Sequence, residues 1–308
     1  MNPDTCIKYE DYKFGPAGLV AVKQAITIID EYLAQGYTLT LRQIYYQFVA
    51  RGWIANTQES YKRLGDIISR GRRSGLLDWM AIEDRTRHTR ERPHWQDPAE
   101  IVLACAGQFH VDLWEGQPQR AEVWIEKDAL AGVVEGACHD LDCPLLSCRG
   151  YLSDSEMWRA SMRIVKRGGA GVETVIFHLG DHDPSGLDMT RDIERRLDLF
   201  GVGRWVMVSR IALTWQQIQE VNPPPNPAKV TDSRAAAYIE RYGPDSWELD
   251  ALDPAFLDKL VRMHVDTRIT KPGLWNRRLR ARKAGRAALK KVAASLNPQR
   301  AFEKEQNP

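Results

Sequence analysis

Four short apolar runs alternate with helical segments in the middle of the chain, and this alternation constrains the fold most. The runs are AEVWIE, PLLSCRG, TVIFHLG and WVMVSRIAL, at residues 121–126, 144–150, 174–180 and 205–213. Apolar residues at helical spacing follow the first three runs, at residues 127–141, 154–167 and 186–199. This order is typical of a largely parallel sheet with helices on both faces. We therefore expect an α/β fold.

The first third of the chain has the pattern of three helices. Apolar residues recur at helical spacing over residues 17–36. Thr40, followed three residues later by Gln43, forms a capping-box pattern at the start of a second helix. A third helix is expected over residues 57–74, and the stretch at 79–93 has the character of a β-wing. The sequence thus indicates a helix-turn-helix or winged-helix unit.

Basic residues are concentrated in two places, although the net charge is only +2. The stretch 267–300 contains eleven Lys or Arg residues and no acidic residue, and the third expected helix carries the other group. One such cluster is equally consistent with a solvated helix face, but two favour a nucleic-acid partner. The candidate DNA contacts are Lys62, Arg63, Arg70, Arg72, Arg73, Arg277, Arg278 and Arg280.

Other features exclude several classes of protein. No run of about 18 apolar residues is present, so we expect no membrane partner. The N-terminal residues lack the apolar core of a signal peptide, and we expect a cytoplasmic, nucleoid-associated protein. Five cysteines without CxxC spacing indicate buried free thiols and no zinc or disulfide framework.

Carboxylates stand at the ends of two expected strands. Glu126 ends the first, and Asp181 and Asp183 follow the third, so all three would lie at the same edge of a parallel sheet. Carboxylate oxygens are the ligands that Mg²⁺ prefers. In extended backbone both aspartates point to one side and His182 points away, which favours a non-ligand role for the histidine. Asp183 is equally placed to be a helix N-cap, and both interpretations stay open.

The segment TLRQIYYQF, residues 40–48, holds a candidate nucleophile. Tyr45 belongs to the apolar stripe of this helix and is expected in the core, whereas Tyr46 falls outside the stripe, one turn after Arg42. The guanidinium can hold a phosphate and stabilise a phenolate, which then attacks phosphorus in a transesterification. The simpler alternative, favoured by the helix alone, is a surface tyrosine that only hydrogen bonds to a phosphate.

These segments together resemble the DNA-cleaving, A-type component of topoisomerase VI and the related meiotic double-strand-break transesterase. TLRQIYY is similar to the family's catalytic segment, in which an arginine precedes two aromatic positions and the second is the nucleophile; Arg42 and Tyr46 match these positions. VWIEKDAL resembles the Toprim motif with its glutamate at Glu126, and GDHDPSGLDM resembles the second metal motif with Asp181 and Asp183.

Two further segments are similar to the same family and occur in the family's order. They are LLSCRGYLSDSEMWRA at residues 145–160, and WELDAL at residues 247–252, where Glu248 matches the family's acid. The resemblance implies a winged-helix (CAP-like) domain over residues 1–95, a Toprim domain over 96–270 and a basic C-terminal segment over 271–308.

The resemblance also implies an activity. A type IIB-like enzyme of this kind would be a homodimer that cuts double-stranded DNA with Mg²⁺ and forms 5′-phosphotyrosyl links, the tyrosine of one protomer acting beside the metal site of the other. The short chain favours a stand-alone, minimal A-like protein, and it leaves open whether a B-type ATPase partner is required. Similarity to Toprim proteins of plasmid defence implies, as an alternative, a nuclease that uses water. A non-catalytic DNA-binding protein is the third interpretation.

Overall fold

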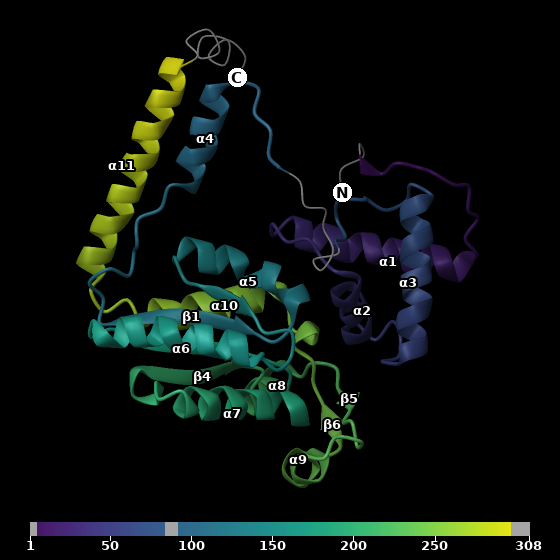
Figure 1. Ribbon diagram of the computed structural model, residues 1–308. Helices are drawn as coiled ribbons and strands as arrows, with labels where there is room; N and C mark the ends of the chain where they lie inside the picture. Colours follow the sequence, from purple (N-terminus) through teal and green to yellow (C-terminus); the bar gives the residue numbers. More distant parts are fainter. Residues whose placement is uncertain (1–4, 84–91, 297–308) are drawn as a thin grey trace.

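The computed structural model describes residues 5–83 and 92–296 (Figure 1). A helical unit from the first third of the chain lies beside a larger α/β unit, and two helices extend from the α/β unit away from its sheet. None of the helices in the described part of the chain has the length and apolar character needed to cross a bilayer.

Three helices form the N-terminal unit, as predicted. They are α1 (Pro16–Leu33), α2 (Leu41–Ala50) and α3 (Gln58–Arg73). The predicted capping box is present, since the Thr40 hydroxyl accepts a hydrogen bond from the Gln43 amide while the Gln43 side chain accepts one from the Thr40 amide. The helices enclose a core that includes Ile28, Ile44 and Phe48, each fully buried.

The predicted wing lies partly outside the described residues, because 84–91 fall within it. Residues 5–83 contain helices and isolated bridges, such as that between Leu39 and Ile82, and no longer strand. A winged-helix assignment therefore stays a prediction.

The α/β unit contains a four-stranded parallel sheet, which confirms the four predicted strands. The strands are β1 (Gln119–Ile125), β2 (Leu145–Ser147), β3 (Glu173–Leu179) and β4 (Val206–Ala212), in the spatial order β2-β1-β3-β4. The parallel α/β fold is therefore established, and its identification as a Toprim domain remains a prediction.

Helices cover both faces of the sheet, as expected for this connectivity. One face packs against α5 (Asp128–Asp140) and α10 (Pro254–Asp266), the other against α6 (Asp154–Gly169) and α7 (Pro184–Leu199). The alternation of side chains along each strand divides the core: Val123 belongs to the first layer and its neighbour Trp124 to the second, both fully buried. Burial of one large apolar side chain stabilises the fold by roughly 1.5–3 kcal/mol. Because many such side chains pack on both faces of this sheet, it supports the residues at its edge rigidly.

The chain between β4 and α10 reaches towards the helical unit. It forms α8 (Trp215–Val221), β5 (Asn226–Pro227), α9 (Ala235–Tyr242), β6 (Asp245–Ser246) and the turn η3 (Leu249–Ala251), while the short turn η2 (Gly203–Trp205) directly precedes β4. Strands β5 and β6 pair antiparallel. Figure 1 shows this small pair at the side of the α/β unit that faces α2.

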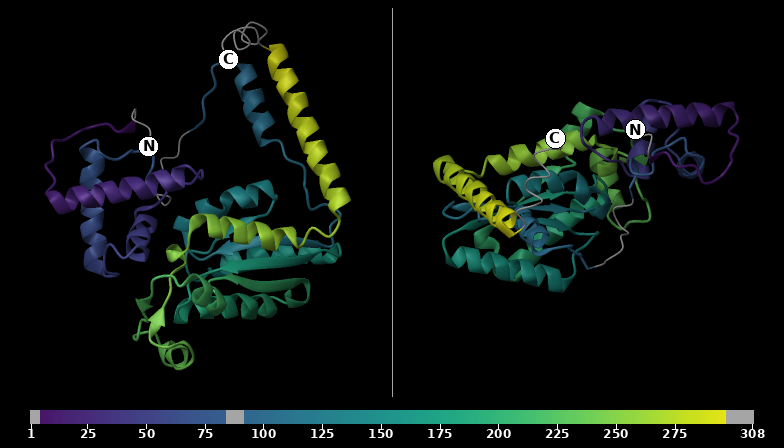
Figure 2. Two further views of the ribbon diagram at one scale, coloured as in Figure 1. Left: turned by 180° about the vertical axis from the view of Figure 1, so that it is seen from behind. Right: turned by 90° about the horizontal axis from the view of Figure 1, so that it is seen from above.

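Two helices from opposite ends of the α/β unit lie side by side, and we call them the helical arm. They are α4 (Pro98–Gln108), which the sequence pattern did not predict, and α11 (Pro272–Leu296). Figures 1 and 2 show both extending away from the sheet. Gly285 allows the close approach, since a Cβ atom at this position would lie 2.2 Å from the ring of Phe109.

All five cysteines are free thiols, as predicted, but not all are buried. Cys138, Cys143 and Cys148 are buried, Cys6 is partly buried, and Cys105 is exposed on α4. The expectation of five buried thiols was therefore wrong for Cys105, because α4 covers α11 with one face only and leaves the other in solvent.

Candidate functional site

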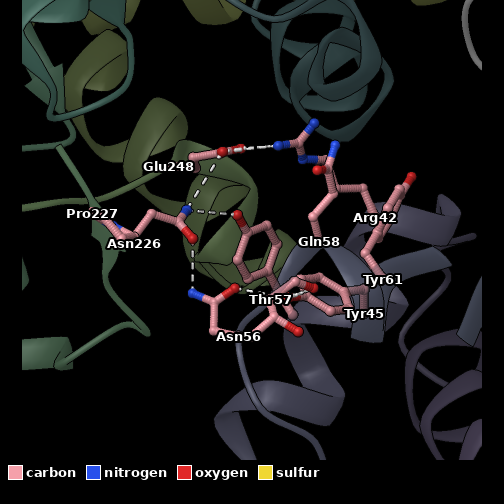
Figure 3. A pocket seen from close by; sticks show the side chains of 10 residues that line it. Arg42, Tyr45, Asn56, Thr57, Gln58, Tyr61, Asn226, Pro227 and Glu248 are labelled. Atoms are coloured by element: carbon pink, nitrogen blue, oxygen red, sulfur yellow. Dashed lines mark hydrogen bonds and ion pairs between the residues drawn. The ribbon is translucent and has the colours of Figure 1, made fainter. Parts of the chain in front are cut away.

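A pocket of about 530 Å³ lies where the helical unit meets the α/β unit (Figure 3). Its walls include Arg42, Tyr45, Tyr46 and Asn56 from the helical unit, and Asn226 and Glu248 from the α/β unit. We call it the interdomain pocket. Residues far apart in the sequence meet here, so local patterns could not have revealed it.

Both tyrosines of α2 are buried, which corrects the expectation that Tyr46 lies on the polar side of the helix. Tyr45 is 4% exposed and Tyr46 is 3% exposed. The hydroxyl of Tyr45 donates to Asn56 Oδ1 at 2.8 Å. Asn226, 180 residues further along, donates to the Tyr46 hydroxyl at 3.0 Å and covers a helix face that would otherwise meet water.

Burial keeps the Tyr46 phenol protonated. Burial, the larger cause, and the nearby Glu248 carboxylate together raise the pKa of Tyr46 to about 12, against the lowering effect of Asn226 and Arg42. Ionisation of this phenol at neutral pH therefore requires a change in its surroundings, such as the arrival of a positive charge or the loss of a negative one.

The Arg42 guanidinium lies near Tyr46, as predicted, but in this structure it is paired with carboxylates. It binds Glu248 Oε2 at 2.6 Å and lies 3.7 Å from Asp250 Oδ2. Burial alone would lower the pKa of Arg42, but these two carboxylates raise it above its usual range. Its side chain is 47% exposed, so the guanidinium remains open to the pocket.

Lys127, which directly follows the predicted ligand Glu126, lies among three carboxylates. Its ammonium group is 3.0 Å from Asp181 Oδ2, 2.8 Å from Glu248 Oε2 and 2.7 Å from Asp250 Oδ2. We call these four residues the lysine cluster. Burial would lower the pKa of Lys127, but Asp181 and the other two carboxylates raise it well above its usual range, so this side chain is a cation at all physiological pH values.

The sequence interpretation missed the roles of Lys127 and Asp250. Two patterns in the sequence could have indicated these roles. WELDAL contains two acids spaced two apart, Glu248 and Asp250, and the separate segment VWIEKDAL contains the adjacent acid and base Glu126 and Lys127. Nothing in the sequence, however, indicates that these two segments lie together.

Of the three predicted metal ligands, a hydrogen bond joins two, and the charge of the third, Asp183, is near enough to act on Glu126. Glu126 Oε2 accepts a hydrogen bond from the Asp181 amide at 2.8 Å, at the carboxyl edge of the sheet as expected. Burial and the neighbouring Asp181 carboxylate raise the pKa of Glu126 to about 7. Asp183, in contrast, is the N-cap of α7, accepting from the Gly186 amide at 2.6 Å, which is the alternative that the sequence left open.

This arrangement does not form a magnesium cage as it stands. The Asp181 carboxylate binds Lys127 and accepts a hydrogen bond from the Leu249 amide at 2.7 Å. Within residues 5–83 and 92–296, no three His, Cys, Asp or Glu side chains are arranged to hold a metal ion. The predicted cation of this edge is thus replaced by an ammonium group of the chain itself.

Arg210, on β4, holds the loop that carries the two aspartates. The buried guanidinium donates to the backbone oxygens of Gly180 at 2.7 Å and Gly186 at 2.9 Å. Burial lowers the pKa of Arg210 to about 10. Between the aspartates, His182 is buried against aromatic rings and lies 2.8 Å from the Tyr238 hydroxyl, in keeping with the non-ligand role expected for it.

The basic residues predicted to contact DNA fall into two kinds. Some contact their own unit: Arg70 with Tyr12, Arg72 with Trp79, Arg73 with Glu10 and Arg278 with Glu115. Arg70 and Arg73 are exposed all the same, but their charges already have these partners. The other four are exposed without such a contact in the described part of the chain, namely Lys62 and Arg63 on α3 and Arg277 and Arg280 on α11. This set of four is the better candidate for a nucleic-acid surface, because its charges are open to a partner.

Comparisons of the chain with protein-family models, with curated proteins and with solved structures find no match. The function must therefore be argued from the residues and their geometry.

Proposed function

We propose that this chain cleaves double-stranded DNA by transesterification, with Tyr46 as the nucleophile and Arg42 as the residue that binds the scissile phosphate. The observation that carries the proposal is the position of the Tyr46 hydroxyl, bonded to Asn226 in a pocket that also contains Arg42. This combination of phenol, guanidinium and amide suits attack on a phosphodiester. It agrees with the resemblance to the DNA-cleaving component of topoisomerase VI.

In the proposed reaction the phenol oxygen bonds to phosphorus and the bond from phosphorus to the 3′ oxygen breaks. The phenol proton leaves for solvent, and the departing 3′ oxygen takes up a proton. One phosphodiester becomes one phosphotyrosyl ester, so the link retains the energy needed to reseal the break. A phosphate bound by Arg42 brings the reacting atoms together, which is the main requirement of such a step.

The Mg²⁺ that the resemblance implies has no assigned part in these steps. Asp183 is the N-cap of α7, and the Asp181 carboxylate forms an ion pair with Lys127. The expected three-carboxylate site is therefore not assembled in this conformation. Loss of cleavage in EDTA remains the prediction for a magnesium-dependent enzyme.

The partners of the reaction are proposals of the same kind. The exposed Lys62, Arg63, Arg277 and Arg280 would contact the duplex backbone. We retain the homodimer, with a B-type ATPase as a possible further partner. The interdomain pocket, however, joins two halves of one chain, which favours Tyr46 acting beside the acids of its own protomer.

A water-using nuclease is the second candidate, and one observation favours it. The pKa of Glu126, about 7, suits a carboxylate that takes a proton from water near neutral pH, whereas that of Tyr46, about 12, does not favour a phenolate.

One plasmid assay separates the candidates. Supercoiled DNA is incubated with Mg²⁺ and wild type, Tyr46→Phe or Glu126→Gln, then denatured with and without protease; Tyr9→Phe, an exposed tyrosine of the same unit, is the control. The transesterase predicts protein-linked 5′ ends that Tyr46→Phe abolishes and Tyr9→Phe retains. Free ends that survive Tyr46→Phe but not Glu126→Gln indicate the nuclease. Salt-sensitive binding without cleavage by any protein supports a non-catalytic role.

If Glu126→Gln alone does not cleave, mixing it with Tyr46→Phe tests which protomer supplies the tyrosine. Catalysis between protomers restores cleavage in the mixture, because a mixed dimer contains one intact site. Catalysis within a protomer leaves the mixture as inactive as its components.

A further inference from the structure

The Glu248 carboxylate is bound by donors from three separate segments. The guanidinium of Arg42 lies 2.6 Å from Oε2 and donates to Oε1 at 2.8 Å. The Lys127 ammonium lies 2.8 Å from Oε2, and the Asn226 amide donates to Oε1 at 3.4 Å. Glu248 is thus the meeting point of two cations and an amide.

These donors suit a phosphodiester as well as they suit a carboxylate. Both anions present two acceptor oxygens that share one negative charge, and the arginine fork and lysine ammonium bind either. Figure 3 shows the three groups from Arg42, Asn226 and Glu248 facing one another at the wall of the interdomain pocket.

Glu248 is also the carboxylate of the lysine cluster that a ligand can displace. Its side chain is 24% exposed, whereas those of Asp181 and Asp250 are 9% and 1% exposed. Three carboxylates surround two cations, Arg42 and Lys127. If Glu248 swings into solvent, the two buried carboxylates balance these cations, and an incoming monoanion restores the charge that left.

We propose that Arg42, Lys127 and Asn226 form a phosphodiester-binding site, and that Glu248 occupies it until a nucleic-acid phosphate takes its place. Asn226 also donates to the Tyr46 hydroxyl, so a phosphate in this site lies beside the phenol. The phosphate brings the negative charge that Glu248 takes away, so the exchange leaves the net charge beside Tyr46 unchanged. This inference depends on the proposed function only in naming DNA as the source of the phosphate.

The test uses dimethyl phosphate, the simplest monoanionic phosphodiester, titrated into the full chain by calorimetry at pH 7.5 in EDTA. Glu248→Gln removes the competing charge with little change of shape and is expected to bind the probe at least tenfold more tightly than wild type. The matched control is Glu240→Gln, an exposed glutamate on α9, which is expected to bind like wild type. Adding Arg42→Gln to Glu248→Gln should abolish the gain.

An equal or weaker affinity of Glu248→Gln would overturn the proposal, as would a gain that persists without Arg42. A second measurement uses NMR and leaves Glu248 unchanged. In wild type labelled with ¹⁵N-arginine, saturating dimethyl phosphate should shift the Nε–H resonance of Arg42. This resonance is assigned by its absence from the spectrum of Arg42→Lys. An unshifted resonance contradicts the exchange of partners. Neither readout involves DNA cleavage, so uncut plasmid would count against the transesterase and not against this site.

Discussion

Replacing Lys127 by methionine tests the electrostatic centre of the molecule. Methionine keeps most of the side-chain volume, so the change removes the positive charge while the packing is largely preserved. Three carboxylates lie within 3.0 Å of the lost ammonium, from Asp181, Glu248 and Asp250. Only Glu248 retains a direct cationic partner at hydrogen-bond distance, the guanidinium of Arg42.

The size of the effect follows from burial. Removing one partner of a buried ion pair costs about 3–5 kcal/mol. Because the Lys127 side chain is 21% exposed, we expect the lower end of that range, about 3 kcal/mol. For a unit of this size each kcal/mol lowers the Tm by roughly 2–4 °C, so the Tm should fall by about 6 to 12 °C.

The pH dependence distinguishes charge from packing. Burial already raises the pKa of Asp181 in wild type, and loss of the Lys127 ammonium, which lowers it, raises it further above its unfolded value. Protonation therefore favours the folded variant, and the deficit is largest above neutral pH and shrinks as the pH falls through this raised pKa. A lost packing contact would give a deficit that does not change with pH.

Calorimetric melting at pH 7.5 and pH 5 measures both effects, with Lys259→Met, an exposed lysine on α10, as the control. Equal Tm values for the two variants, or a Lys127→Met deficit that is the same at both pH values, would refute the reasoning.

Three further predictions concern the rest of the fold. Glu122→Gln should cost about 3 kcal/mol at pH 7 in urea unfolding, because Arg167 loses its buried carboxylate partner. In wild type that arginine holds the pKa of Glu122 low despite burial, so the wild-type advantage should disappear as the pH falls through this lowered pKa. Gly285→Val should lift α11 from Phe109 and speed tryptic cleavage of α11 at least tenfold, while the near-ultraviolet spectrum of the sheet unit is retained. Arg280→Gln should lower the slope of log affinity against log salt for duplex DNA by about 1, and an unchanged slope would remove Arg280 from the binding surface.

The sequence predicted those parts of the fold that depend on neighbouring residues. The four strands, the helices that follow them and the Thr40 cap were all correct, because apolar periodicity and capping are local properties. The meeting of Glu126 with Asp181 was also predictable, because parallel strands share their carboxyl edge.

The parts that were missed depend on contacts between distant segments. The burial of Tyr46 requires Asn226, and the lysine cluster requires Asp250 to reach Lys127, 123 residues away. Helix α4 is short and has one charged residue, Glu100, so its sequence shows no clear division into an apolar and a polar face. Its contact with α11, more than 160 residues later, is what identifies it as a packed helix. Asp183 was undecided because one residue type serves both as metal ligand and as N-cap.

The helical arm has a consequence for synthesis of the chain. Helix α4 ends about 160 residues before α11 begins, so at ordinary translation rates it leaves the ribosome roughly 10 to 30 s before its partner exists. During this interval the face of α4 that includes Ala99 and Ala106, its buried residues in the folded chain, has no cover from α11. Expression at high rates should therefore yield more aggregate than slower translation does.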